Sequence, residues 1–259
     1  MTAKKSFADQ SIADTYRRLR LMASAVLIGL PMLIVLSGYL AGGHKLQPSL
    51  SDYYFVVIDG GIPRTLFVIF LAVLGSILVA YRGLSDADDF IHNTAGFFAF
   101  GVAFFPMNCD KNVHAACVPG ILPVLHGPSA FLLFLAAFIS VLFGGGPNLI
   151  QSLSRLPNPQ KWLSKLNKIQ WLSGVLMVVG ITAFLLHQRF PDFMPEAGWI
   201  FWIEYLGFFG FGLYWLLLFM LIRDANRAGV MMSSGTKSGF GRLEQPDLMQ
   251  TPEPWELIP

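Results

Sequence analysis

Six apolar runs, each about 20 residues long, dominate this chain of 259 residues and constrain its fold. A helix needs about 20 apolar residues to cross the roughly 30 Å of hydrocarbon in a bilayer. A backbone in lipid must satisfy its own hydrogen bonds, and these runs lack the alternation of a membrane β-barrel strand. The sequence therefore predicts an all-α polytopic membrane helix bundle with six transmembrane helices, over residues 21–40, 65–81, 90–107, 121–143, 169–186 and 199–222.

Composition supports this class and excludes others. Hydrophobic residues make up 54% of the chain and charged residues only 13%, whereas a soluble domain carries about 25% charged residues. The net charge of +2 is small and its positive residues are scattered, so a nucleic-acid partner is not expected. The first apolar run is longer than the usual 7–15 residues of a signal peptide and lacks a clear A-x-A site, so we expect it to remain as a helix.

The distribution of Lys and Arg predicts the orientation, because cytoplasmic loops of membrane proteins are enriched in both. With the N-terminus in the cytoplasm, that side holds 14 of the 18 basic residues and the opposite side holds 4. The four are Lys45, Arg64, Lys111 and Arg189. Both termini are therefore predicted to be cytoplasmic, in a bacterial inner (plasma) membrane.

The regions outside the spans divide the chain into three parts. Residues 1–20 are predicted to be a cytoplasmic N-terminal segment, residues 21–223 the transmembrane domain, and residues 224–259 a flexible cytoplasmic tail. Residues 159–170 place apolar side chains on one face and three lysines on the other. This pattern is typical of a helix lying in the membrane interface, and a basic loop is the alternative.

Two cysteines, Cys109 and Cys117, fall in the loop that this orientation places outside. An oxidising compartment favours a disulfide between them, and two free thiols are the alternative. Three ligands of loose spacing (the two cysteines and His114) do not indicate a metal site.

Four ionisable residues lie within the spans or at their edge and are candidates for function, because charge within a membrane is costly. Glu204 lies inside the last predicted helix and His126 inside the fourth, both near the outer surface, so a His–Glu pair there is allowed. Asp89 and His92 lie near the inner start of the third helix. Structural hydrogen bonding, interface placement and helix N-terminal electrostatics are the alternatives to a functional role.

The first outer loop is the preferred place for a ligand or partner contact, because loops often carry function. Ser49 and the residues Ser51, Asp52, Tyr53, Tyr54 and Arg64 give it a polar, aromatic rim, and the last five are the candidate contact residues. We find no G-x-S-x-G, H-E-x-x-H, P-loop or C-x-x-C motif, so no catalytic residue, metal or cofactor is predicted.

Small residues recur at four-residue spacing and predict close helix packing in a compact bundle. The third predicted helix carries Ala95, Ala99 and Ala103, the fourth carries Ala136, Ser140 and Gly144, and the sixth carries Gly207, Gly210 and Gly212.

Residues 48–140 resemble a bacterial domain-of-unknown-function family of six-helix membrane proteins. More distantly they are similar to the damage-regulated autophagy modulator family. The residues that carry the resemblance are Ser51, Tyr53, Tyr54, Arg64, Gly96, Pro106 and His126. The resemblance implies the six-helix fold and no established reaction. Alkaline ceramidase-like hydrolases are a further comparison, but they hold zinc partly through a late H-x-x-x-H that this chain lacks.

The sequence thus predicts a non-enzymatic membrane protein acting as an accessory subunit, sensor or lipid-binding scaffold. Its expected partners are the lipid bilayer and other membrane subunits, contacted through helix faces and the C-terminal tail. Two alternatives stay open: a metal-dependent lipid hydrolase using His126 and Glu204, and a small transporter or channel.

Overall fold

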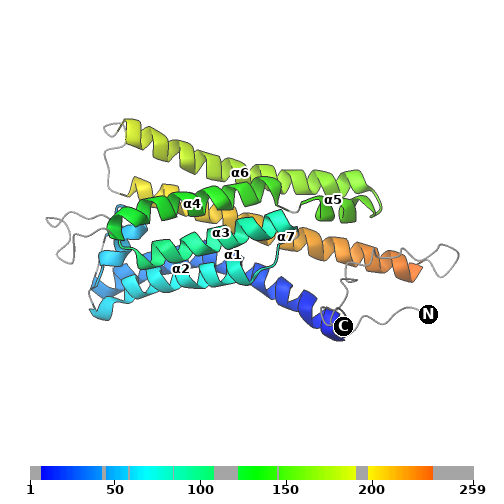
Figure 1. The fold of residues 1–259 in the computed structure, drawn as a ribbon, viewed down its shortest axis with the longest axis horizontal. Helices are drawn as coiled ribbons and strands as arrows, with labels where there is room; N and C mark the ends of the chain where they lie inside the picture. Colours follow the sequence, from blue (N-terminus) through cyan, green and yellow to red (C-terminus); the bar gives the residue numbers. More distant parts are fainter. Residues whose placement is uncertain are drawn as a thin grey trace, which may run out of the picture.

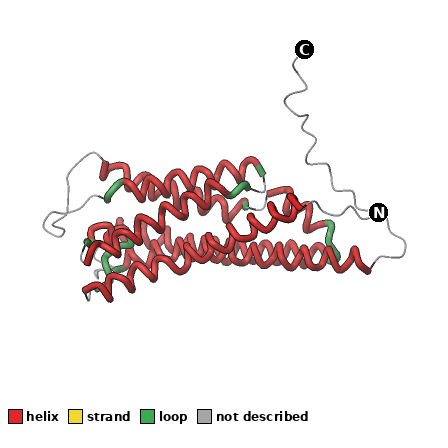
Figure 2. Tube along the Cα trace, turned by 90° about the horizontal axis from the view of Figure 1, so that it is seen from below, coloured by secondary structure: helices red, strands yellow, loops and turns green. Residues whose placement is uncertain are grey.

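The protein forms a bundle of long helices in the computed structural model, which describes residues 7–42, 45–57, 59–83, 85–107, 122–144, 146–190 and 198–235 (Figure 1). Within these residues the secondary structure is helical and no strand is present (Figure 2). The α-helices are α1 (Phe7–Gly42), α2 (Ile62–Ala80), α3 (Asp86–Phe104), α4 (Leu122–Phe143), α5 (Gly146–Ser154), α6 (Pro159–Arg189) and α7 (Trp199–Gly235). Two short 3-10 helices, η1 (Ser51–Phe55) and η2 (Asp59–Gly61), lie between α1 and α2.

The predicted all-α bundle is confirmed, since each of the six predicted spans lies on a separate long helix. In the part of the chain that the structure describes, five helical segments are long and apolar enough to cross a membrane. The exception among the predicted spans is α3, which has 19 residues and three aspartates in its first turn. It packs against α2 on one side and α4 on the other, so it forms part of the same bundle.

Three helices are longer than the apolar runs within them, because polar helix-forming residues continue each helix beyond its apolar part. Helix α1 begins at Phe7, inside the predicted N-terminal segment, and α7 continues to Gly235, beyond the predicted domain boundary at residue 223. Residues 159–170 are the first turns of α6 rather than a separate interfacial helix or a loop. Residues 236–259 of the predicted tail lie outside the described residues.

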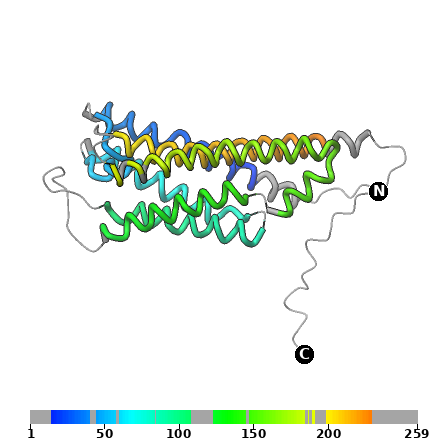
Figure 3. The backbone as a smooth tube through the Cα atoms, turned by 90° about the horizontal axis from the view of Figure 1, so that it is seen from above, coloured from blue at the N-terminus to red at the C-terminus, as the bar shows by residue number. Residues whose placement is uncertain are grey.

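The helices alternate in direction, so each end of the bundle collects particular loops and helix termini (Figure 1). One end holds the start of α1, the α2–α3 turn, α5, the start of α6 and the end of α7. We call it the basic end, because most of the described Lys and Arg residues lie toward it. The opposite end holds residues 45–61, the end of α3 and the starts of α4 and α7. In Figure 3, α3 and α4 lie side by side, and α5 leads from the end of α4 to the start of α6, against which it packs.

Small residues bring particular helix pairs close together. A Cβ atom added to Gly75 of α2 would lie 2.9 Å from the carbonyl oxygen of Gly96 on α3. A Cβ atom added to Gly96 would lie 2.8 Å from the carbonyl oxygen of Gly75. Three glycines of α7 face three different helices: Gly207 meets Phe134 of α4, Gly210 meets α6, and Gly212 meets α1. The predicted alanine stripe of α3 is likewise buried.

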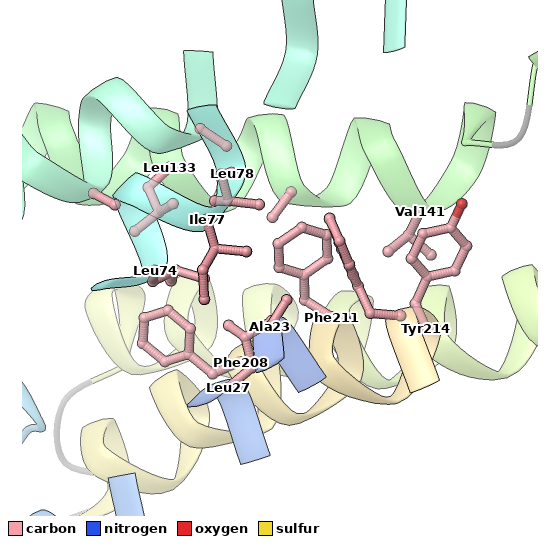
Figure 4. Close-up of a cluster of buried hydrophobic side chains, with 14 of the residues drawn as sticks. Ala23, Leu27, Leu74, Ile77, Leu78, Leu133, Val141, Phe208, Phe211 and Tyr214 are labelled. Carbon is pink, nitrogen blue, oxygen red and sulfur yellow. The ribbon is translucent and has the colours of Figure 1, made fainter. Parts of the chain in front are cut away.

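The middle of the bundle is filled with large apolar side chains from α1, α2, α4 and α7 (Figure 4). Phe70 and Phe208 meet edge to face, with ring centroids 5.1 Å apart, and Phe134 packs 4.8 Å from Phe208. Leu27, Leu74 and other aliphatic residues complete the layer. This apolar layer separates two polar clusters, one toward each end.

Candidate functional site

Residues 49–52, in the connection between α1 and α2, form a tight turn that is held by its own side chains. The Asp52 carboxylate accepts hydrogen bonds from the Ser49 backbone N–H (2.9 Å) and from the Ser49 hydroxyl (2.9 Å). The Asp52 N–H donates in return to the Ser49 oxygen at 3.1 Å. This reciprocal arrangement is a capping box, which satisfies backbone donors at the start of a helix. It folds η1 so that Ser51, Asp52 and Tyr53 are buried.

His126 fastens this turn to α4 and to the end of α3. Its Nδ1 lies 2.6 Å from the Phe105 carbonyl oxygen, and its Nε2 lies 3.1 Å from the Ser51 hydroxyl oxygen. A carbonyl only accepts, so Nδ1–H donates to it and Nε2 accepts the Ser51 proton in the neutral ring. Both ring nitrogens are therefore used inside the protein, and the side chain is 7% exposed.

Glu204 fastens the same turn to α7. Its carboxylate accepts a hydrogen bond of 2.6 Å from the backbone N–H of Leu50. One turn earlier, the Phe201 N–H donates to the Pro48 carbonyl oxygen at 2.9 Å. His126 and Glu204 thus meet through the loop between them: they bind adjacent residues, Ser51 and Leu50. We call Ser49, Ser51, Asp52, His126 and Glu204 the loop cluster.

A second buried cluster lies toward the basic end and is centred on His92. Its Nδ1 lies 2.7 Å from the Asp88 carbonyl oxygen, and its Nε2 lies 3.0 Å from the Ser140 hydroxyl on α4. The pattern repeats that of His126: one nitrogen donates to a backbone carbonyl and the other accepts from a serine. The Asp88 carboxylate lies 3.4 Å from Nδ1. His92 and Ser140 are 3% and 1% exposed, so this contact is inside the bundle.

Aromatic rings and an arginine extend the second cluster to α1, α2 and α7. The His92 ring lies 5.2 Å from both Tyr81 and Trp215, which are themselves 4.7 Å apart. Arg20 of α1 donates to the Tyr81 hydroxyl through Nε (3.3 Å) and Nη2 (3.0 Å). We call Arg20, Tyr81, His92, Ser140 and Trp215 the histidine–arginine cluster. Five helices or helix ends contribute to it.

Asp89, the fourth predicted intramembrane polar residue, serves the α2–α3 turn. Its carboxylate accepts from the Gly83 N–H at 3.0 Å and from the Asn93 amide at 3.2 Å. The Ser85 hydroxyl accepts from the Asp88 N–H at 3.2 Å and caps α3. A Cβ atom on Gly83 would collide with the backbone of Asp88 and Asp89, so the turn requires glycine there.

The remaining predicted residues have different positions. The Arg64 guanidinium donates to the Tyr54 hydroxyl at 3.0 Å and lies over the Tyr54 ring at 4.4 Å, with Arg64 exposed. Tyr53 is 1% exposed, and this burial raises the pKa of its phenol. Ser51, Asp52 and Tyr53 therefore stabilise the loop from within, and their predicted role in ligand or partner contact stays a prediction. Cys109 and Cys117 lie outside the described residues.

Metal-binding geometry is absent from the described residues: nowhere in them do three His, Cys, Asp or Glu side chains gather closely enough to hold an ion. The loop cluster offers one histidine and two carboxylates, which are engaged with hydroxyl and backbone groups instead.

Several residues of the two clusters were not identified from the sequence as site residues. They are Arg20, Tyr81 and Trp215, and Ser140 was assigned only to helix packing. The S-x-x-D spacing of Ser49 and Asp52, and of Ser85 and Asp88, is a local signal that predicts both caps. No local signal pairs Arg20 with Tyr81 or His92 with Ser140, which are 61 and 48 residues apart.

Comparisons with known proteins do not assign this chain to a family. No family model matches it, and neither a curated protein nor a solved structure does. The function is therefore argued from the geometry alone.

Proposed function

We propose that this chain is a non-enzymatic integral membrane protein that acts as a lipid-binding scaffold or accessory subunit. The observation that carries the proposal is the way its buried polar residues are used. Both buried histidines and Glu204 bind backbone groups or serine hydroxyls of the bundle itself. Such contacts join helices and position a loop, and they leave these groups bound to the protein rather than presented to a substrate.

The distribution of charge supports the proposed orientation, with both termini in the cytoplasm of a bacterial cell. Of the described basic residues, ten lie toward the basic end: Arg17, Arg18, Arg20, Arg82, Arg155, Lys161, Lys165, Lys168, Arg223 and Arg227. Only Lys45, Arg64 and Arg189 lie toward the other. By the positive-inside rule the basic end faces the cytoplasm.

Purification of the tagged full-length chain in a mild detergent tests the scaffold function. We expect phospholipid or a second membrane protein to co-purify in a stoichiometric amount, measured by native mass spectrometry. A monomer free of lipid and protein would contradict the proposal. So would one bound metal ion per chain together with hydrolysis of a lipid ester or amide.

A second candidate, a serine hydrolase of the membrane surface, is favoured by one contact. The Ser51 hydroxyl is 3.1 Å from His126 Nε2, and the Phe105 carbonyl orients the ring from Nδ1. Serine and histidine are hydrogen-bonded as the nucleophile and base of a catalytic triad are, with a backbone carbonyl in the place of the triad carboxylate. Labelling with a fluorophosphonate probe tests it. A hydrolase requires labelling that Ser51→Ala abolishes and Ser140→Ala retains, whereas the scaffold function predicts no labelling of Ser51.

A further inference from the structure

Helix α6 is too long to lie entirely within a bilayer. Its 31 residues span roughly 46 Å at 1.5 Å per residue, whereas the hydrocarbon is about 30 Å thick. Residues 169–188 are free of charge, but the preceding turns carry Lys161, Lys165 and Lys168. The N-terminal turns of α6 therefore project out of the hydrocarbon into the headgroup region.

The projecting turns have one face fixed by packing and one face that carries the lysines. Trp162 and Leu166 are buried, at 8% and 2% exposure, and α5 packs against α6. The Trp162 Nε1–H donates to the Pro157 carbonyl oxygen at 3.1 Å. All three lysines are exposed. Their spacing of four and three residues places them on the same helix face. The Lys165 ammonium lies 4.9 Å from the centre of the Trp162 ring.

The stretch of chain that carries these lysines has no acidic residue of its own. Residues 146–170, which include α5 and the start of α6, contain one arginine, three lysines and neither Asp nor Glu. Trp171, the next exposed aromatic residue along α6, is 70% exposed. Tryptophans concentrate at the boundary between headgroups and hydrocarbon, so Trp171 places Lys168, three residues earlier, at headgroup depth.

We propose that Lys161, Lys165 and Lys168 form a binding site for the headgroups of anionic phospholipids. A row of ammonium groups at headgroup depth meets the lipid phosphates directly, and each basic residue near such a surface adds to the attraction. The proposal deepens the scaffold function and rests on it for the membrane location. It adds the class of lipid and the residues that select it.

Native mass spectrometry and thermal shift in detergent test the site, with phosphatidylglycerol as the anionic probe and phosphatidylcholine as the neutral one. The test variant carries Lys161→Gln, Lys165→Gln and Lys168→Gln. The control carries Arg18→Gln, Arg82→Gln and Arg227→Gln, which remove the same charge from exposed positions on three other segments toward the same end. A third variant replaces the three lysines with arginine.

We expect the wild-type chain to bind phosphatidylglycerol in preference to phosphatidylcholine. The lysine-to-glutamine variant should bind it roughly a hundredfold more weakly, as the loss of three charges near the surface implies. The arginine variant should retain binding, because it keeps the three charges. The control should weaken binding less than the test variant does, because its three charges lie on three separate segments and form no row. Without lipid, the midpoint of unfolding should be the same in all four proteins, because the substituted side chains are exposed.

Four results would overturn the headgroup site. Equal weakening in the test and control variants would mean that binding follows net charge alone. Unchanged binding in the test variant would place the lipid elsewhere. Equal stabilisation by soluble glycerol 3-phosphate would show a phosphate site that does not need a lipid. Binding of phosphatidylcholine with no anionic preference would contradict this site while leaving the scaffold function intact.

Discussion

Glu204, on α7, holds the loop of residues 45–57 in place through its carboxylate. Its carboxylate accepts the N–H of Leu50, a residue that is 1% exposed. A buried N–H without a partner costs about 1–3 kcal/mol. Glu204→Ala should lower the free energy of unfolding by about that amount. Glu204→Gln keeps an acceptor oxygen, so its free energy of unfolding should fall by less.

The stability of both variants is measured as the midpoint of thermal unfolding in detergent, with size-exclusion chromatography after heating as the readout. Release of the loop gives a second readout, since Ser51 is 9% exposed in the intact protein. In a Ser51→Cys background, Glu204→Ala should speed the reaction of the new thiol with a maleimide. Equal stability of the alanine and glutamine variants would show that the hydrogen bond contributes nothing.

Helix contact depends on the absence of side chains at a few positions. The reciprocal approach of Gly75 and Gly96 lets the α2 and α3 backbones meet. Gly96→Ala places a methyl group 2.8 Å from the Gly75 carbonyl oxygen, and overpacking of this kind costs about 1–3 kcal/mol. The midpoint of unfolding should fall. Gly29→Ala on α1 is the matched control, because nothing lies within 4 Å of the added atom.

The control should be neutral or stabilising, since alanine exceeds glycine in helix propensity by about 1 kcal/mol. If the midpoint of unfolding falls for Gly96→Ala and rises for Gly29→Ala, the effect of packing is separated from that of helix propensity. If both variants gained stability, the close approach of α2 and α3 would not constrain the bundle.

At the scale of the whole molecule, the uneven charge of the two ends predicts the topology. Alkaline phosphatase is active only outside the cytoplasm. A fusion after residue 259 should therefore be inactive, and one within residues 108–121 should be active. The same orientation predicts that Cys109 and Cys117 are oxidised: the purified chain should react with a maleimide only after reduction. An active C-terminal fusion would reverse the proposed orientation.

Local sequence patterns predicted the presence of the helices better than the residues at which they begin and end. The apolar runs located all six long helices, because the length of a spanning helix follows directly from hydrocarbon thickness. The ends of α1, α6 and α7 extend further, since a helix continues through polar residues as long as they favour it. Hydropathy marks which residues suit lipid and not where hydrogen bonding of the helix stops.

The candidate site likewise has residues that the sequence could identify and partners that it could not. Glu204, His126, His92 and Asp89 were recognisable from the sequence because polar residues in apolar runs are exceptional. Their partners were not: Leu50 is 154 residues from Glu204, and Ser51 is 75 residues from His126. Ser140 has the small size of a packing residue, and only the placement of α3 beside α4 makes it the partner of His92.

The sequence by itself determined that this is an all-α bundle of six long helices with one basic end, because hydrophobicity and charge act through local composition. The tertiary structure alone decided how the intruding polar groups are satisfied. A buried donor or acceptor needs a partner within about 3 Å, and for residues far apart in the chain only the packing of helices supplies one. His126 and Glu204 therefore both attach the buried turn at residues 49–52 to the bundle, and His92 joins α3 to α4.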